Sequence, residues 1–79
     1  MKITYDEKYN IAYIKFKEKT EKVQTIRMSD ELNVDISPDG KIYGIELLNA
    51  GEQLDVVGSK EIIFDNLTAH QSVRIPIAD

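Results

Sequence analysis

The chain contains no cysteine and no tryptophan, one histidine and two prolines among its 79 residues. The absence of cysteine excludes disulfides, thiolate metal sites and thiol nucleophiles, and it fits a reducing compartment. No apolar run approaches the ~18 residues that span a bilayer. The apolar start at residues 1–5 is followed at once by Asp6 and Glu7, which does not fit a signal peptide. We therefore expect a cytoplasmic protein that makes no membrane contact.

Basic charge is also scarce, with 10 Lys and Arg against 14 Asp and Glu, so the net charge is -4. This balance lacks the basic footprint of phosphate binding, and nucleic acid is not expected as a main partner. The charge is unevenly spread, because residues 1–29 carry 7 basic and 4 acidic groups whereas residues 30–79 carry 3 and 10. Surfaces of opposite charge on two copies of the chain would attract each other.

The length supports a single domain over residues 1–79, since no linker, repeat or low-complexity tract divides it. Ile and Val number 16, against 5 Leu and 4 Ala, a bias that favours strands. We predict a mainly β fold, possibly α+β: a small antiparallel sheet of hairpins with at most one short helix. Residues 52–57 could form one helical turn or an irregular stretch. The expected strands are residues 2–5, 11–17, 23–28, 31–37, 41–48, 60–64 and 73–77.

The second hairpin, residues 31–48, has the clearest pattern, and two turns are possible at its tip. A two-residue turn at Asp39-Gly40 would pair Leu32 with Leu47, Val34 with Ile45 and Ile36 with Tyr43, which matches every apolar residue. A turn that begins at Pro38 and places Gly40 in a bulge would shift all of these pairs by one residue. The side-chain pattern favours the first turn, whereas Pro38 favours the second.

This first half of the chain resembles a bacterial family. The residues that carry the resemblance are Tyr5-Asp6, the strand Ala12-Tyr13-Ile14, Val34-Asp35-Ile36, and the run from Asp39 to Glu46. Together they are similar to domain-of-unknown-function family 2283 over roughly residues 1–50. The resemblance implies small proteins built from strands and turns, and it implies no activity. The chain departs from the family at Asn10 and Ser37, where an Asp is usual, which weakens any acid-based site.

One polar group could hold a cation. In the preferred register Asn33, Asp35 and Glu46 lie on the face opposite the apolar one, and Gly44 leaves a small hollow between the two carboxylates. Repulsion between carboxylates can be relieved by Mg or Ca, which prefer oxygen ligands. The alternative interpretation is a plain solvated face, and charged residues on an outward strand face need no special cause.

Other candidate groups have simpler interpretations. His70 lies in a polar stretch without a nucleophile motif, so a surface histidine is expected and no catalytic residue is assigned. Lys15, Lys17 and Lys19 form a stripe beside Tyr13 that could contact nucleic acid weakly, but lysines also keep strand edges from pairing.

The function that best fits these features is a non-enzymatic interaction or scaffold module that acts as a homo-oligomer. So small a domain has a marginal core, and self-association is a common remedy. Pro76 removes a ladder donor from the last strand, which should therefore lie at an edge where a second copy can pair. The alternatives are a cation-dependent binding protein or hydrolase that uses Asp35 and Glu46 with Mg or Ca, and a weak nucleic-acid contact; otherwise no cofactor is expected.

Overall fold

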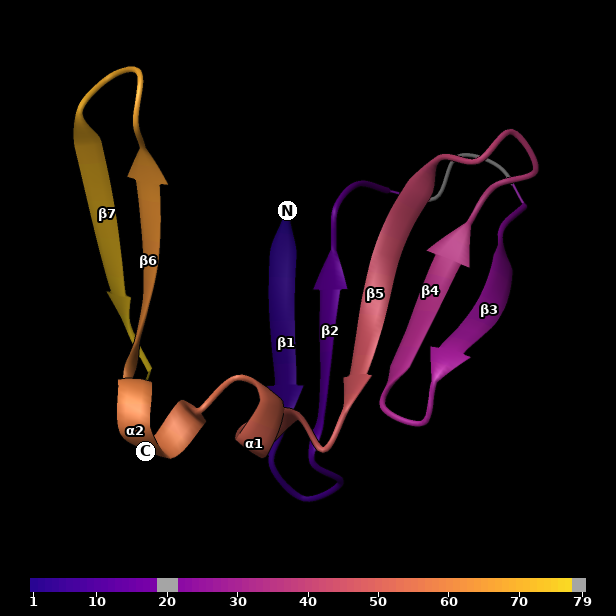
Figure 1. The fold of residues 1–79 in the computed structure, drawn as a ribbon, viewed down its shortest axis with the longest axis horizontal. Coiled ribbons are helices and arrows are strands. Elements are labelled where there is room, and N and C mark those ends of the chain that lie inside the picture. Colours follow the sequence, from indigo (N-terminus) through magenta and orange to yellow (C-terminus); the bar gives the residue numbers. More distant parts are fainter. Residues whose placement is uncertain (19–21, 78–79) are drawn as a thin grey trace.

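The computed structural model describes residues 1–18 and 22–77, and its elements are nearly all strands (Figure 1). They are β1 (Lys2–Asp6), β2 (Ile11–Lys15), β3 (Gln24–Ser29), β4 (Leu32–Ile36), β5 (Ile42–Leu48), α1 (Ala50–Gln53), α2 (Val56–Ser59), β6 (Glu61–Asn66) and β7 (Gln71–Pro76). The predicted mainly β fold is confirmed, and each predicted strand is present within a few residues. The sequence predicts at most one short helix, whereas the structure has two one-turn helices.

The first five strands form one antiparallel sheet in the order β1-β2-β5-β4-β3, and β6 and β7 form a separate hairpin. After β2 the chain crosses to the far edge of the sheet, and it returns through β4 to β5 in the centre. Strand β5 therefore pairs with β2 on one side and β4 on the other. This order brings side chains from the first hairpin beside those of the second.

The register of the β4–β5 hairpin follows one predicted turn in its pairs far from the tip and the other predicted turn at the tip. Leu32 pairs with Leu47 and Val34 with Ile45, as the apolar pattern predicts. At the tip the predicted pair of Ile36 with Tyr43 is wrong, because Ile36 pairs with Ile42 after a register shift.

The turn itself is the one that begins at Pro38. The Gly40 N–H donates to the Ser37 carbonyl, the Ser37 N–H donates to the Lys41 carbonyl, and Gly40 has φ 89°. Proline at the first central position sets the turn. The irregularity that follows then restores the apolar register beyond Asp35.

Helix α1 is fastened to the sheet by an asparagine pair. Asn10 and Asn49 both have left-handed backbones, at φ 56° and 52°, which asparagine tolerates better than most residues. Asn10 Nδ2 donates to Asn49 Oδ1 at 3.0 Å, and Asn10 Oδ1 accepts the Gly51 N–H at 2.7 Å. An aspartate at position 10 could not donate the first of these bonds. Asparagine at position 10 therefore makes a contact with Asn49 that aspartate could not make.

The hydrophobic core is very small for a chain that is 42% hydrophobic. Among the described residues the buried hydrophobic side chains are those of Ala12, Tyr43 and Ala50. A single sheet has no second layer to cover its faces, whereas domains are normally built from two packed layers. The apolar face of the sheet is therefore half-buried in the middle and open toward its two edges, β1 and β3.

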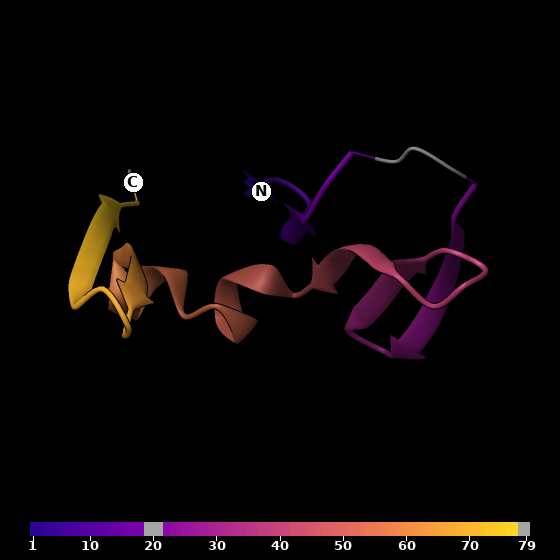
Figure 2. The same cartoon turned by 90° about the horizontal axis from the view of Figure 1, so that it is seen from above.

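The β6–β7 hairpin, which we call the arm, stands to one side of the sheet and is connected to it through α1 and α2 (Figures 1 and 2). The radius of gyration is 14.2 Å, against about 12 Å expected for a compact chain of this length. In the part of the chain that the structure describes, no helix is long and apolar enough to cross a membrane. The molecule is thus an open sheet with a projecting hairpin.

Candidate functional site

Two surfaces of the sheet are candidates for function, and strand alternation separates them. One is a polar face around Gly44, where the sequence predicts a hollow between Asp35 and Glu46. The other is the opposite, apolar face. The observed register places Asp35 opposite Gly44 and Asn33 opposite Glu46, so the predicted polar face is confirmed.

The hollow at Gly44 is filled by a side chain from the first hairpin. Tyr13 on β2 pairs with Glu46, and its phenol ring lies across Gly44. A Cβ atom added at Gly44 would lie 2.7 Å from Tyr13 Cζ and 2.9 Å from the Ile14 carbonyl oxygen, which is closer than real Cβ contacts. Glycine at this position therefore lets the tyrosine cross β5.

The tyrosine reaches a buried carboxylate. Tyr13 Oη donates a 2.6 Å hydrogen bond to Asp35 Oδ2, and Thr25 Oγ1 donates one of 2.6 Å to Asp35 Oδ1. Asp35 is only 8% exposed. Buried charged groups need hydrogen-bond partners, and hydrogen bonds to a charged group are stronger than those between neutral groups. Asp35 thus links side chains from β2, β3 and β4 across β5.

The two carboxylates of the predicted cation site have separate partners. Glu46 Oε1 accepts a 2.8 Å hydrogen bond from Asn33 Nδ2, whereas Asp35 accepts those of Tyr13 and Thr25. Within residues 1–18 and 22–77, no group of three or more His, Cys, Asp and Glu side chains is arranged to hold a metal. A Mg or Ca site at Asn33, Asp35 and Glu46 stays a prediction, and the tyrosine hydroxyl occupies the space that it would use.

Sequence reasoning missed the roles of Tyr13 and Thr25. It placed Tyr13 beside the lysine stripe, because β2 was considered without its neighbour in the sheet. Gly44, in the middle of β5, is the signal that could have indicated the position of Tyr13. A glycine inside a strand often marks a close approach by another group.

The lysine stripe is engaged with other side chains where the structure describes it. Lys15 Nζ lies 2.9 Å from Glu18 Oε1, and Lys17 Nζ lies 4.8 Å from the centre of the Tyr43 ring. Lys19 lies outside the described residues. The Lys15 contact lowers the pKa of Glu18, first through a hydrogen bond and then through charge. The stripe as a nucleic-acid contact stays a prediction.

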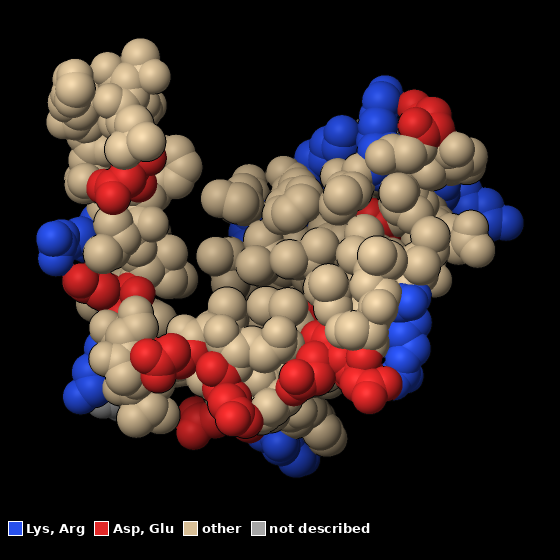
Figure 3. Space-filling model, in the orientation of Figure 1, with Lys and Arg blue, Asp and Glu red and all other residues tan. Residues whose placement is uncertain are grey.

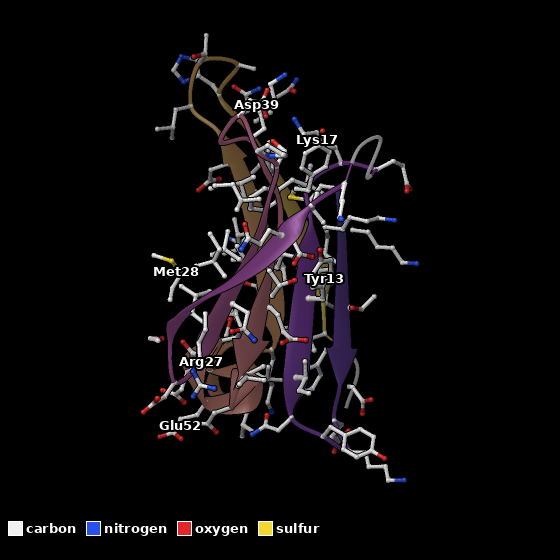
Figure 4. All side chains as sticks on the ribbon, turned by 90° about the vertical axis from the view of Figure 1, so that its right-hand side faces the viewer. Tyr13, Lys17, Arg27, Met28, Asp39 and Glu52 are labelled. Carbon is white, nitrogen blue, oxygen red and sulfur yellow. The ribbon has the colours of Figure 1, made fainter. Side chains whose placement is uncertain are left out.

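The tip of the β4–β5 hairpin carries a second small polar group at the same end of the sheet as Lys17 (Figure 4). The Ser37 hydroxyl donates to Asp39, and Lys41 Nζ lies 3.4 Å from Asp39 Oδ2. The pKa of Asp39 is lowered, mainly by the Ser37 hydrogen bond. Burial, the next largest effect, opposes this, and the hydrogen bond and charge of Lys41 lower the pKa further. His70 lies exposed in the β6–β7 turn, which confirms the predicted surface histidine.

The apolar face extends across the whole sheet. Pairing aligns Ile3 with Ile14, Ile14 with Ile45, Ile45 with Val34 and Val34 with Ile26, so one apolar row crosses all five strands. In Figure 3 uncharged side chains cover most of the sheet, and acidic side chains gather below it. The two ends of the row are the most open, with Ile3 41% and Ile26 39% exposed. A row of this kind is suited to contact with another protein surface.

The fold and these surfaces define a small antiparallel β protein with an open apolar sheet face and a hydrogen-bonded polar face. The family model described as a protein of unknown function, DUF2283, matches residues 2–50, and the chain belongs to this family. The matched region contains the whole five-stranded sheet and ends at Ala50, where α1 begins, so α2 and the arm lie beyond it. Searches among curated proteins and among solved structures found no match for the chain.

Proposed function

We propose that the chain is a non-enzymatic interaction module of the bacterial cytoplasm that works as a homodimer. The observation that carries this proposal is the poor cover of its apolar side chains. The described residues bury three hydrophobic side chains, and the apolar row across the sheet is half-buried in its middle and exposed at Ile3 and Ile26. A sheet face of this kind in a monomer would be a liability for aggregation, and covering it releases water from apolar surface.

The accessible surface supports the same proposal. It is 6216 Å², against about 4,900 Å² expected for a folded monomer of this mass, an excess of about 1,300 Å². Each partner in a standard stable interface buries about 800 Å². The excess surface of one chain is therefore sufficient for a stable interface.

The polar face supports a structural role over an acid-base role. The carboxylate of Asp35 is engaged by hydroxyl groups from two other strands, and Glu46 by the Asn33 amide. These hydrogen bonds join the strands, and they engage the two carboxyl groups that an acid-base reaction would use. The absence of cysteine from the sequence favours the cytoplasm as the compartment.

Light scattering with size-exclusion chromatography tests the proposal. We expect a mass near twice 9.0 kDa at micromolar concentration and a melting temperature that rises with protein concentration. Ile3→Lys places a charge in the apolar row and should yield monomers. Thr4→Lys is the matched control, because Thr4 is the next residue of β1 and points to the other face.

The result that would overturn the proposal is a wild-type chain that remains a monomer up to high micromolar concentration. Equal weakening of the dimer by Ile3→Lys and Thr4→Lys would place the interface elsewhere than on the apolar face.

A further inference from the structure

An open apolar cleft lies between the arm and the N-terminal edge of the sheet. The part next to Met1 has a volume of about 570 Å³ and is lined by Met1, Ile3, Ile62, Ile63, Phe64, Val73 and Ile75. The part next to α2 has a volume of about 440 Å³ and reaches Tyr5 and Ile14 on the sheet. Leu54 and Val56, in the connection between sheet and arm, also line this part. A cleft of this size has room for side chains of another molecule.

The arm is itself amphipathic, and its apolar face borders this cleft. Ile62 pairs with Ile75 and Phe64 with Val73, so these four side chains share one face of the hairpin. The other face carries the ion pair of Arg74 with Glu61 at 3.2 Å. Phe64 is 56% exposed and Val73 is 55% exposed, so the apolar face of the arm has no sufficient cover within its own chain.

We propose that in the dimer each chain inserts the apolar face of its arm into the cleft of the other chain, against Ile3 and the apolar row of the sheet. This inference rests on the proposed self-association and names the surfaces that form it. In a two-fold dimer the same patch is used twice, so an arm and a cleft on one chain form two equal contacts. The excess surface of about 1,300 Å² is enough for both contacts on each chain.

The chemistry of the cleft matches that of the arm. Glu61 has the one charged side chain in its lining among the described residues, and Arg74 of the same chain already pairs with it. The arm presents Ile, Phe and Val side chains of the same kind as the side chains across the cleft. Contact between them would remove two apolar surfaces from water without burying an unpaired charge.

Disulfide trapping tests the inference, and the natural chain has no cysteine to interfere. An Ile3→Cys chain is mixed with a Val73→Cys chain, the mixture is oxidised under native conditions, and mass spectrometry identifies which chains are joined. Ser72→Cys replaces Val73→Cys in the control, because Ser72 is the adjacent residue of β7 and points to the other face of the arm. Ile75→Cys offers a second position on the apolar face if Val73→Cys reduces folding.

We expect a mixed disulfide between Ile3→Cys and Val73→Cys chains in about tenfold greater yield than with Ser72→Cys, because a disulfide forms only when the two Cα atoms lie within ~7 Å. If wild-type chains are dimers but the two mixtures give equal yields, the arm contact is wrong and the proposed self-association stands. If wild-type chains are monomers, both are wrong.

Two further outcomes would also overturn the arm contact. The first uses a chain that carries both Ile3→Cys and Val73→Cys. If oxidation joins these two cysteines within one chain and not between two chains, the arm closes on its own sheet. A wild-type monomer that binds a fluorescent apolar dye, and loses this binding in Val73→Asp but not in Ser72→Asp, would show a cleft that takes a small ligand instead.

Discussion

The hydroxyl group of Tyr13 on β2 reaches across β5 and donates a 2.6 Å hydrogen bond to Asp35 on β4. The two residues are 22 positions apart in the chain, and they meet because Gly44 between them has no side chain. Thr25 completes the group from β3. The group joins four adjacent strands, so its disruption should affect the whole sheet.

Removal of the tyrosine hydroxyl should destabilise the fold. Tyr13→Phe keeps the ring over Gly44 but deprives Asp35 of one donor, and we expect a loss of about 1–3 kcal/mol in the free energy of unfolding. Urea unfolding measures this loss. The protein concentration is held fixed, because dimerisation makes stability depend on concentration. Tyr9→Phe is the control, because Tyr9 is 64% exposed, and a change above about 0.5 kcal/mol there would argue against a specific effect.

Thr25→Val should act on the same carboxylate. Because both donors bind Asp35, the double variant with Tyr13→Phe should differ from the sum of the single changes by at least about 0.5 kcal/mol. Strict additivity in this cycle would show that the two hydroxyl groups do not act through Asp35.

Gly44→Ala should be destabilising even though alanine is small. The added methyl group would lie 2.7 Å from Tyr13 Cζ and 2.9 Å from the Ile14 carbonyl, and only the tyrosine ring can move away. We expect a loss of about 1–3 kcal/mol, as for other overpacked sites. Thermal unfolding checks the loss. A Gly44→Ala chain as stable as wild type would show that the tyrosine does not cross β5 at this point.

The turn at Gly40 offers a test in which only the backbone matters. No atom lies within 4 Å of a Cβ added at Gly40, yet its φ is 89°. Gly40→Ala should therefore cost about 1–2 kcal/mol from backbone strain alone. Gly40→Asn should cost less, because asparagine visits the left-handed region more readily. If urea unfolding shows that Gly40→Ala is more stable than Gly40→Asn, this result contradicts the observed turn.

Asp39 should make the hairpin tip sensitive to acid. Its pKa is lowered in the folded chain from an ordinary value of 3.8, so its stabilising contribution is present above that value and is lost as the pH falls through the lowered pKa. Ser37→Ala removes the main cause and should raise the Asp39 pKa toward 3.8, as measured by NMR titration of the carboxyl group. Lys41→Gln should raise it less. An unchanged pKa in Ser37→Ala would contradict the assigned cause.

Local sequence patterns predicted much of the fold because hairpins are local structures. The alternation of Leu32, Val34 and Ile36 against residues 42–48 identified both strands and their polar face. The pairs nearest the turn were predicted less well. There Pro38 and the apolar pattern favour different registers, and the structure accommodates both with an irregularity after Asp35. A conflict between two local preferences is settled only by the energy of the assembled sheet.

The sequence by itself determined the class of the protein, the approximate place of each strand and the side of each strand that is apolar. These features follow from steric preferences and period-two alternation, which act over a few residues. The tertiary structure decided the strand order, the passage of Tyr13 over Gly44 to Asp35, and the cleft between Ile3 and the arm. Those contacts join residues far apart in the chain, and their free energy depends on packing in three dimensions, which no local pattern records.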